Sequence, residues 1–177
     1  MKKSIFMALT LLMSVAMQGQ TYWNGTSNKT FSGSGTQADP YLIGTPEQLA
    51  GLAERTNVDK EDFAGQYIKL TADIYLTDFT NPDTTAWLQW EPIAHSLMRY
   101  GEATDYGYFR GHFDGNGHTV YSLYYGAGMN WADDWNPQDL DLDLSSYDFS
   151  VMNKALFVNL DGGTIENLNI ANAKMAG

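Results

Sequence analysis

Residues 109–123 read FRGHFDGNGHTVYSL, and residues 157–170 read FVNLDGGTIENLNI. Both stretches begin with Phe, reach Asp-Gly after a large apolar residue, and pass through Gly and Thr to Val or Ile and then Leu. Glycine adopts the positive φ of tight turns at no steric cost, so each stretch predicts a strand, a glycine turn and a second strand. Two such units predict stacked coils that bury their faces on one another. Two unrelated β-hairpins are the alternative, because Asp-Gly is also a common hairpin turn.

The composition and the preceding sequence also favour β-structure. The chain of 177 residues contains 11 Tyr, 8 Phe, 5 Trp and 17 Gly, a combination typical of strands joined by tight turns. Tyr41-Leu42-Ile43 predicts a short strand. From Tyr67 to Leu76 polar and apolar residues alternate, which predicts one strand with one buried face. A turn-rich loop follows over 77–86.

One helix is expected near the N-terminus, over about residues 46–56. Thr45 suits the N-cap, Pro46 the first helical position, and Gln48 completes a capping-box pattern. The helix is amphipathic, because Leu49, Leu52, Ala53 and Thr56 recur at helical spacing on one side. A helix this short is marginal alone, so we expect its apolar side to rest on the open end of a sheet.

The first 20 residues have the features of a secretory signal peptide. Lys2 and Lys3 precede an apolar run over 5–15, which is too short to span a bilayer but suits a signal sequence. Ser14 and Ala16 supply the small residues of a cleavage site, and Gly19 offers a second one. We therefore expect an exported protein, extracellular or on the cell surface, with residues 21–177 forming one domain. No segment of that mature chain is long enough to cross a membrane.

Charge and cysteine content exclude several classes of partner and site. Loss of Lys2 and Lys3 leaves eight basic residues against 21 acidic ones, a net charge of −13. So acidic a surface disfavours nucleic acid, which binds through Lys and Arg. The absence of Cys excludes disulfides, thiolate metal sites and a Cys nucleophile.

An ordered set of segments carries a family resemblance. They are Gly35-Thr36, Asp39–Ile43, Glu47–Leu49, Phe63–Ile74, Trp90–Ile93, Phe113–Val120 and Leu156–Leu168. The set resembles the N-terminal region of bacterial surface proteins with GLUG-type repeats, over most of residues 33–170. The resemblance implies a right-handed parallel β-helix (a β-solenoid) with an adhesive or structural role, and it supplies no catalytic residues. Two departures are Val158, where the family has Gly after Leu-Phe, and Ala94, where it has Gly after Pro-Ile.

The end of the sequence suggests a further expectation. Ala176-Gly177 follows a finished strand, and a solenoid needs capped ends. We expect either a truncated member or a module whose open C-terminal coil pairs with further repeats or with another chain.

An inserted loop over about 126–153 contains most of the candidate ligand-binding residues. Flat aromatic rings suit the apolar faces of sugars, so the candidate glycan-binding residues are Trp87, Trp131, Trp135 and Tyr147. Five acids in the loop could together bind Ca²⁺: Asp133, Asp134, Asp139, Asp141 and Asp143. Their spacing is not that of an EF-hand, because Leu144 replaces the required Gly. A solvated acidic loop without a cofactor is the preferred interpretation.

Catalytic patterns are weak. His112 and His118 flank Asp114 and would face each other in a hairpin, but no further metal ligand has a recognised spacing. Glu91 or Glu102 could pair with a loop acid for glycoside cleavage. We therefore expect a non-catalytic exported surface module whose partner is a glycan or another surface protein. A carbohydrate-binding module is the first alternative and a polysaccharide-cleaving β-helix enzyme is the second.

Overall fold

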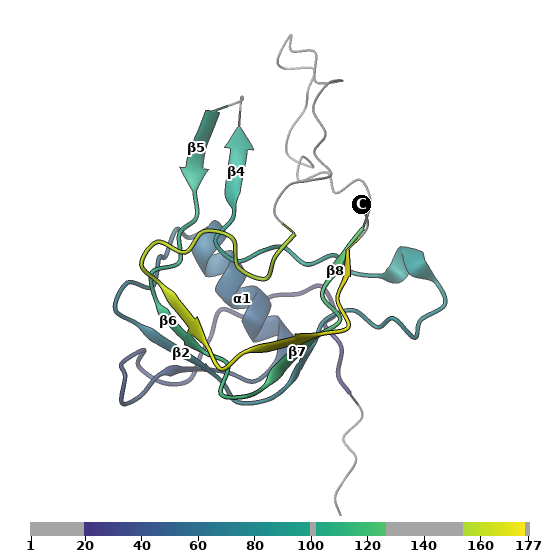
Figure 1. The fold of residues 1–177 in the computed structure, drawn as a ribbon, viewed down its shortest axis with the longest axis horizontal. Helices are drawn as coiled ribbons and strands as arrows, with labels where there is room; N and C mark the ends of the chain where they lie inside the picture. The colour runs from purple at the N-terminus through teal and green to yellow at the C-terminus, as the bar shows by residue number, and fades with distance from the viewer. Residues whose placement is uncertain (1–19, 100–101, 127–153, 176–177) are drawn as a thin grey trace, which may run out of the picture.

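The computed structural model describes residues 20–99, 102–126 and 154–175 (Figure 1). These residues are mainly β, with the α-helix α1 (Pro46–Asn57) and the short 3-10 helix η1 (Thr84–Ala86). The strands are β1 (Tyr41–Ile43), β2 (Tyr67–Leu70), β3 (Ile74–Tyr75), β4 (Ser96–Arg99), β5 (Glu102–Tyr106), β6 (His112–Asp114), β7 (Thr119–Tyr121), β8 (Tyr124–Tyr125), β9 (Thr164–Glu166), β10 (Asn169–Ala171) and β11 (Lys174–Met175). The expected mainly-β fold with one N-terminal helix is confirmed.

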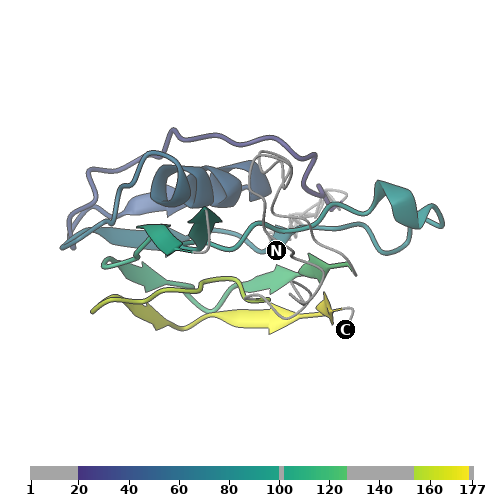
Figure 2. The same ribbon diagram turned by 90° about the horizontal axis from the view of Figure 1, so that it is seen from above.

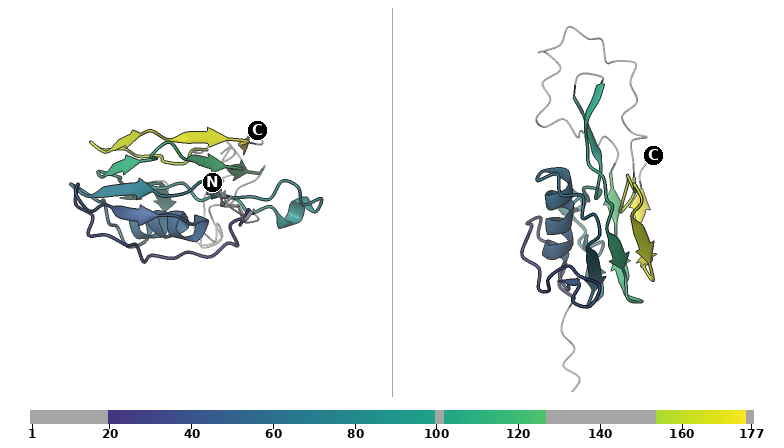
Figure 3. Two further views of the ribbon diagram at one scale, coloured as in Figure 1. Left: turned by 90° about the horizontal axis from the view of Figure 1, so that it is seen from below. Right: turned by 90° about the vertical axis from the view of Figure 1, so that its left-hand side faces the viewer.

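Most strands form parallel sheets, with strand orders β1-β2-β6-β9, β10-β7-β3 and β11-β8. Among the named strands of the described residues, only β4 and β5 pair antiparallel. The consecutive strands β6, β7 and β8 lie in three different sheets, and β9, β10 and β11 pair with them in the same order. Figures 2 and 3 show these segments as successive layers, in chain order from α1 to β11.

Equivalent positions of successive layers lie directly on one another. Ile68 pairs with Phe113, which pairs with Ile165, and Ile74, Val120 and Ile170 form a second such row. Half-buried positions stack as well, since the rings of Tyr75 and Tyr121 lie 4.7 Å apart and almost parallel. The apolar residues of each layer therefore form the surface on which the next layer packs.

The last two layers also bend at matching places. Asn116, between β6 and β7, has φ of 53°, and Asn167, between β9 and β10, has φ of 52°. The next bend repeats this with Ser122 at 61° and Asn172 at 55°. Asn tolerates this left-handed conformation better than most residues. The Asn167 side chain also donates to the Asp114 carboxylate (3.0 Å) and so joins the two bends.

Helix α1 matches its prediction to within a residue and covers the first end of the stack (Figures 1 and 2). The Thr45 hydroxyl accepts a hydrogen bond from the Gln48 N–H (3.2 Å), which satisfies one of the free donors of the first turn. All four residues of the predicted apolar side are buried. Gln48 completes the capping differently, because its side chain accepts from Gly44 N–H rather than from Thr45.

The expectation of one continuous strand from Tyr67 to Leu76 is wrong. The chain bends at 71–73, so that β2 and β3 belong to different sheets. Asp73 occupies the bend, where its carboxylate accepts the Thr119 N–H (3.0 Å) from the next layer. Ile68, Leu70, Ile74 and Leu76 are buried nevertheless. Polar and apolar residues alternate in the same way on both sides of the bend, so the sequence pattern does not reveal it.

The alignment of the two Asp-Gly stretches is also wrong. Their shared residue order would set Val120 beside Ile165, but the sheets pair Val120 with Ile170 and Phe113 with Ile165. Asp161 lies next to Phe109, to whose carbonyl its N–H donates (3.2 Å). The hairpin alternative fails too, because β6 pairs with β2 and β9 and not with β7.

Candidate functional site: the open end of the stacked sheets

The layer formed by β9, β10 and β11 leaves apolar side chains in solvent. Ile170 is 48% exposed and Met175 is 51% exposed. Their partners in the preceding layer are Val120 and Tyr125, both of which are completely buried. Burial thus stops abruptly at the last layer, at positions that are core one layer earlier. We call this layer, residues 160–175, the open end.

The backbone of the open end is also unpaired on one side. Within the described residues, β9 pairs only with β6, β10 only with β7 and β11 only with β8. A free edge presents N–H and C=O groups that can pair with another strand. The same layer therefore offers hydrogen-bonding groups and an apolar surface together.

The opposite end of the stack is covered. Helix α1 lies across it, with Leu49 and Leu52 fully buried (Figure 3). The segment before β1 then crosses the helix, and its Asn28 N–H donates to the Glu47 carbonyl (2.8 Å). A β-carbon on Gly51 would collide with Asn28, so glycine permits this close crossing. Of the two ends of the described stack, only the open end therefore exposes apolar side chains at positions that are buried in the layer before it.

An arginine on the preceding layer forms ion pairs with layers on both sides of it. Arg110 contacts both Asp62 (2.7 Å) and Asp161 (2.5 Å). Because these side chains are about 40–50% exposed, such ion pairs are worth little energy and mainly set orientation.

Trp87 lies beside the open end, in a cluster of aromatic rings. Its ring packs edge-on against Phe79 and Tyr124, with centroids 5.0 and 5.4 Å away. The Lys174 ammonium group lies 4.2 Å from the Trp87 ring centroid, a cation–π distance. The sequence did not indicate that Lys174 and Tyr124 contact Trp87, because these residues come from other layers.

The remaining predicted site residues lie outside the described part of the chain. They are the aromatic candidates Trp131, Trp135 and Tyr147 and the five calcium candidates, Asp133, Asp134, Asp139, Asp141 and Asp143. In the described part, no three acidic or His side chains come together as a metal site would require. No helix there is long and apolar enough to span a membrane.

The two His residues that flank Asp114 have separate neighbours. His112 Nδ1 lies 2.9 Å from the Thr164 hydroxyl, whereas His118 Nδ1 lies 3.2 Å from the Asp73 carboxylate. Each His contacts an adjacent layer rather than the other His. Their expected meeting depended on a hairpin, but His112 lies on β6 and His118 lies just before β7, which belongs to a different sheet.

Glu91 belongs to a network beneath the C-terminal end of α1. Its Oε1 atom lies 2.6 Å from His95 Nε2 and accepts from the Asn57 amide (3.1 Å). These partners, His95 first, hold the pKa of Glu91 below its usual value, against the opposing effect of burial. Glu102, the other predicted acid, lies on β5.

Comparisons with protein-family models, with curated proteins and with solved structures find no match to this chain.

Proposed function

We propose that this protein is an exported, non-catalytic scaffold module of the bacterial cell surface, built as a segment of right-handed parallel β-helix. Its open end receives a further coil of the same pattern. The observation that carries this proposal is the contrast between Ile170 and Met175, half exposed, and their fully buried counterparts Val120 and Tyr125. The resemblance to N-terminal regions of GLUG-type surface proteins agrees with it.

The parallel register indicates which occupant fits the open end. Rows such as Ile74, Val120 and Ile170 continue in register from layer to layer. The next member of each row would be another large apolar residue, carried by a strand parallel to β10. A coil of that kind would satisfy the free edge and bury the exposed side chains at once.

The carboxylate at Glu91 does not suit one of the two roles in glycoside cleavage, that of the general acid. A general acid for glycoside cleavage needs a raised pKa, so that it holds a proton near neutral pH. The pKa of Glu91 is lowered instead. Its partners keep it ionised, as in a structural or ligand-binding carboxylate, and the second carboxylate of a glycosidase is ionised as well.

A peptide copying residues 154–175 is the probe for the open end. Added to the whole protein, it should slow hydrogen exchange in β9, β10 and β11 while leaving β2 and β3 unchanged. The matched control is the same peptide with Ile165→Lys and Ile170→Lys, which should give no protection. If neither peptide alters exchange, or if both act equally, the open end does not receive a coil.

Sedimentation of the protein alone tests the other occupant, a second copy. Self-association that masks β9–β11 and prevents peptide binding would replace the proposed occupant with a second chain.

Export is tested separately, by expressing the complete sequence in a bacterium with a general secretion pathway. We expect protein outside the cytoplasm whose first residue follows Ala16 or Gly19. Lys2→Glu with Lys3→Glu should reduce export, because the positive charge of the leader is lost. Recovery of the intact chain from the cytoplasm alone would contradict the proposal.

A further inference from the structure

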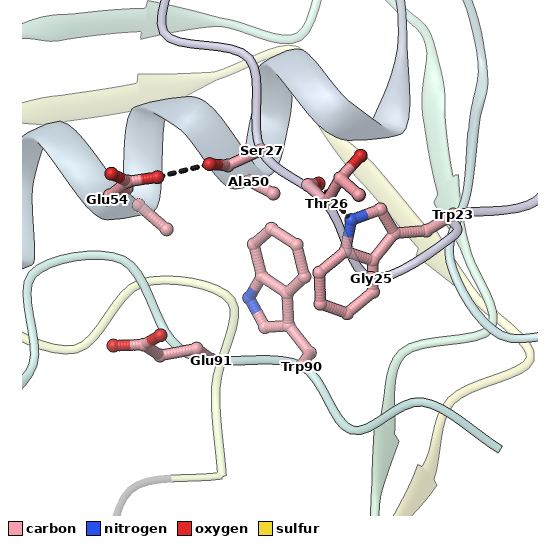
Figure 4. A pocket seen from close by; sticks show the side chains of 9 residues that line it. Trp23, Gly25, Thr26, Ser27, Ala50, Glu54, Trp90 and Glu91 are labelled. Carbon is pink, nitrogen blue, oxygen red and sulfur yellow. Dashed lines mark hydrogen bonds between the residues drawn. The ribbon is translucent and has the colours of Figure 1, made fainter. Parts of the chain in front are cut away.

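A pocket of about 310 Å³ lies at the covered end of the stack, away from the open end. Its lining includes Trp23, Thr26, Ala50, Glu54, Trp90 and Glu91 (Figure 4). Pockets that hold small ligands start at about this size. Its walls come from three parts of the chain: the segment before β1, helix α1 and the stretch after η1.

Hydrogen bonds fix the wall contributed by the N-terminal segment. The Trp23 N–H donates to the Tyr75 and Leu76 carbonyls (2.9 and 3.1 Å), and its indole N–H donates to the Thr26 carbonyl (2.7 Å). The Trp23 ring meets the Trp90 ring edge to face, with centroids 5.6 Å apart. The wall is therefore held in place before any ligand binds.

Trp90 carries a polar group that lacks a partner. The residue is 1% exposed, and its indole Nε1 has no hydrogen-bond acceptor among the described residues. Figure 4 shows this nitrogen on the side of the ring that faces Glu54 and Glu91. Buried N–H groups are nearly always paired, so the pocket holds a donor in need of an acceptor.

Two carboxylates border the same space, and each already has donors. Glu54 contacts the Lys29 ammonium group (3.0 Å) and accepts from the Ser27 hydroxyl. Glu91 receives both of its bonds on Oε1. Its side chain is half exposed. Both residues have lowered pKa values, Glu54 through Ser27 first and Glu91 through His95 first.

These groups define the chemistry of the ligand. A group that lies between the Trp90 N–H and the Glu91 carboxylate must accept one hydrogen bond and donate another, which a hydroxyl does and an ammonium group cannot. The Lys29 ammonium group beside Glu54 also offsets the negative charge of that carboxylate, so the ligand itself need not be a cation. The Trp23 ring offers a flat apolar surface beside this polar pair.

We propose that this pocket binds one neutral pyranose unit of a glycan, with a ring hydroxyl between Trp90 Nε1 and Glu91 and the ring against Trp23. The site is distinct from the predicted aromatic candidates and does not depend on the open end. The scaffold would then bind neutral pyranoses at its covered end.

The direct test follows the Trp90 indole resonance in a ¹⁵N-labelled sample of the protein. The probes are the methyl pyranosides of glucose, galactose, mannose and N-acetylglucosamine, with tetramethylammonium, which carries no hydroxyl, as the cation. A saturable shift of the Trp90 indole signal with at least one pyranoside, and none with tetramethylammonium, is the expected result. A shift with tetramethylammonium alone, or no shift with any pyranoside, overturns the proposal.

Two variants connect the signal to the geometry. Trp90→Phe keeps an aromatic ring but removes the N–H, and we expect about tenfold weaker binding of the best pyranoside, the upper range for one lost hydrogen bond. Glu91→Gln, which removes the charge of the proposed acceptor, is the second variant should Trp90→Phe not fold, with a smaller loss expected. Trp87→Phe, outside the pocket, is the control and should bind normally. Unchanged affinity in both pocket variants would contradict the assignment.

The pyranoside site and the open end are tested independently. Ile170→Lys changes the open end and should leave pyranoside binding unaltered. A negative result for pyranoside binding would therefore leave the scaffold proposal intact.

Discussion

At the scale of single residues, a few polar groups connect segments far apart in the sequence. The Asn57 side chain donates to Glu91 and to the Pro92 carbonyl (2.9 Å), and it accepts the His95 N–H (3.2 Å). Asn57 is almost completely buried, as is His95. This network ties the end of α1 to the chain that follows η1, and so fixes the position of Glu91.

The Glu91 network predicts a pH dependence of stability. The pKa of Glu91 is lower in the folded protein than its ordinary value of 4.5, so the stabilisation is present above pH 4.5 and disappears as the pH falls through the lowered pKa. Urea unfolding from pH 7 to pH 3 should show this loss. In Glu91→Gln the loss should be smaller over the same range. An identical pH profile for both proteins would contradict the assignment.

A side chain at position 115, where the protein has Gly, is predicted to clash with the next layer. A β-carbon there would lie 2.6 Å from the Asn167 carbonyl oxygen and from the Leu168 α-carbon. Gly115→Ala should therefore cost about 1–3 kcal/mol, the usual range for overpacking, as measured by urea unfolding. The matched control is Gly117→Asn, because Gly117 has φ of 78° and open space around it, and Asn tolerates positive φ. A larger loss in the control would refute the clash.

At the scale of elements, helix α1 and the bends between strands have different structural roles. Helix α1 buries its apolar face on one end of the stack, and the segment before β1 pairs with the strand edges there, Ser32 with Leu42 and Tyr22 with Tyr75. The bends at Asn116 and Asn167 direct the chain from one sheet into the next. Capping and bending together explain why the strands stay short and still share one core.

The N-cap of α1 gives a prediction at this scale. Thr45→Ala removes the acceptor for the Gln48 N–H and should cost about 1 kcal/mol of folding stability, whereas Thr45→Ser should cost less. Thermal unfolding followed by circular dichroism measures both. Equal stability of the Ala variant and the parent would show that the cap is satisfied in another way.

At the scale of the whole molecule, the stack is asymmetric. One end is covered by α1 and by the segment before β1, while the other presents β9, β10 and β11 with one free side (Figure 2). The pocket lies at the covered end and the proposed docking surface at the other. Two separate interactions are therefore compatible with one scaffold.

This asymmetry predicts opposite outcomes at two positions in the same row. Val120 is fully buried and Ile170, its register partner, is half exposed. Val120→Lys should prevent folding because it buries an unpaired charge. Ile170→Lys should change the free energy of unfolding by less than about 1 kcal/mol. Circular dichroism with urea titration compares them, and equal destabilisation would show that Ile170 is buried in solution.

The sequence alone determined helix α1 and strand β1. Thr45 and Pro46 marked where α1 begins, apolar spacing marked its buried face, and β1 followed from three adjacent residues, because caps and periodicity act over a few residues. The tertiary structure alone decided the bend at Asp73, the register of Phe113 with Ile165, and the meeting of Trp23, Trp90 and Glu91. Alternation is the same on both sides of a bend and in several registers, so only the packing of one layer on another selects among them.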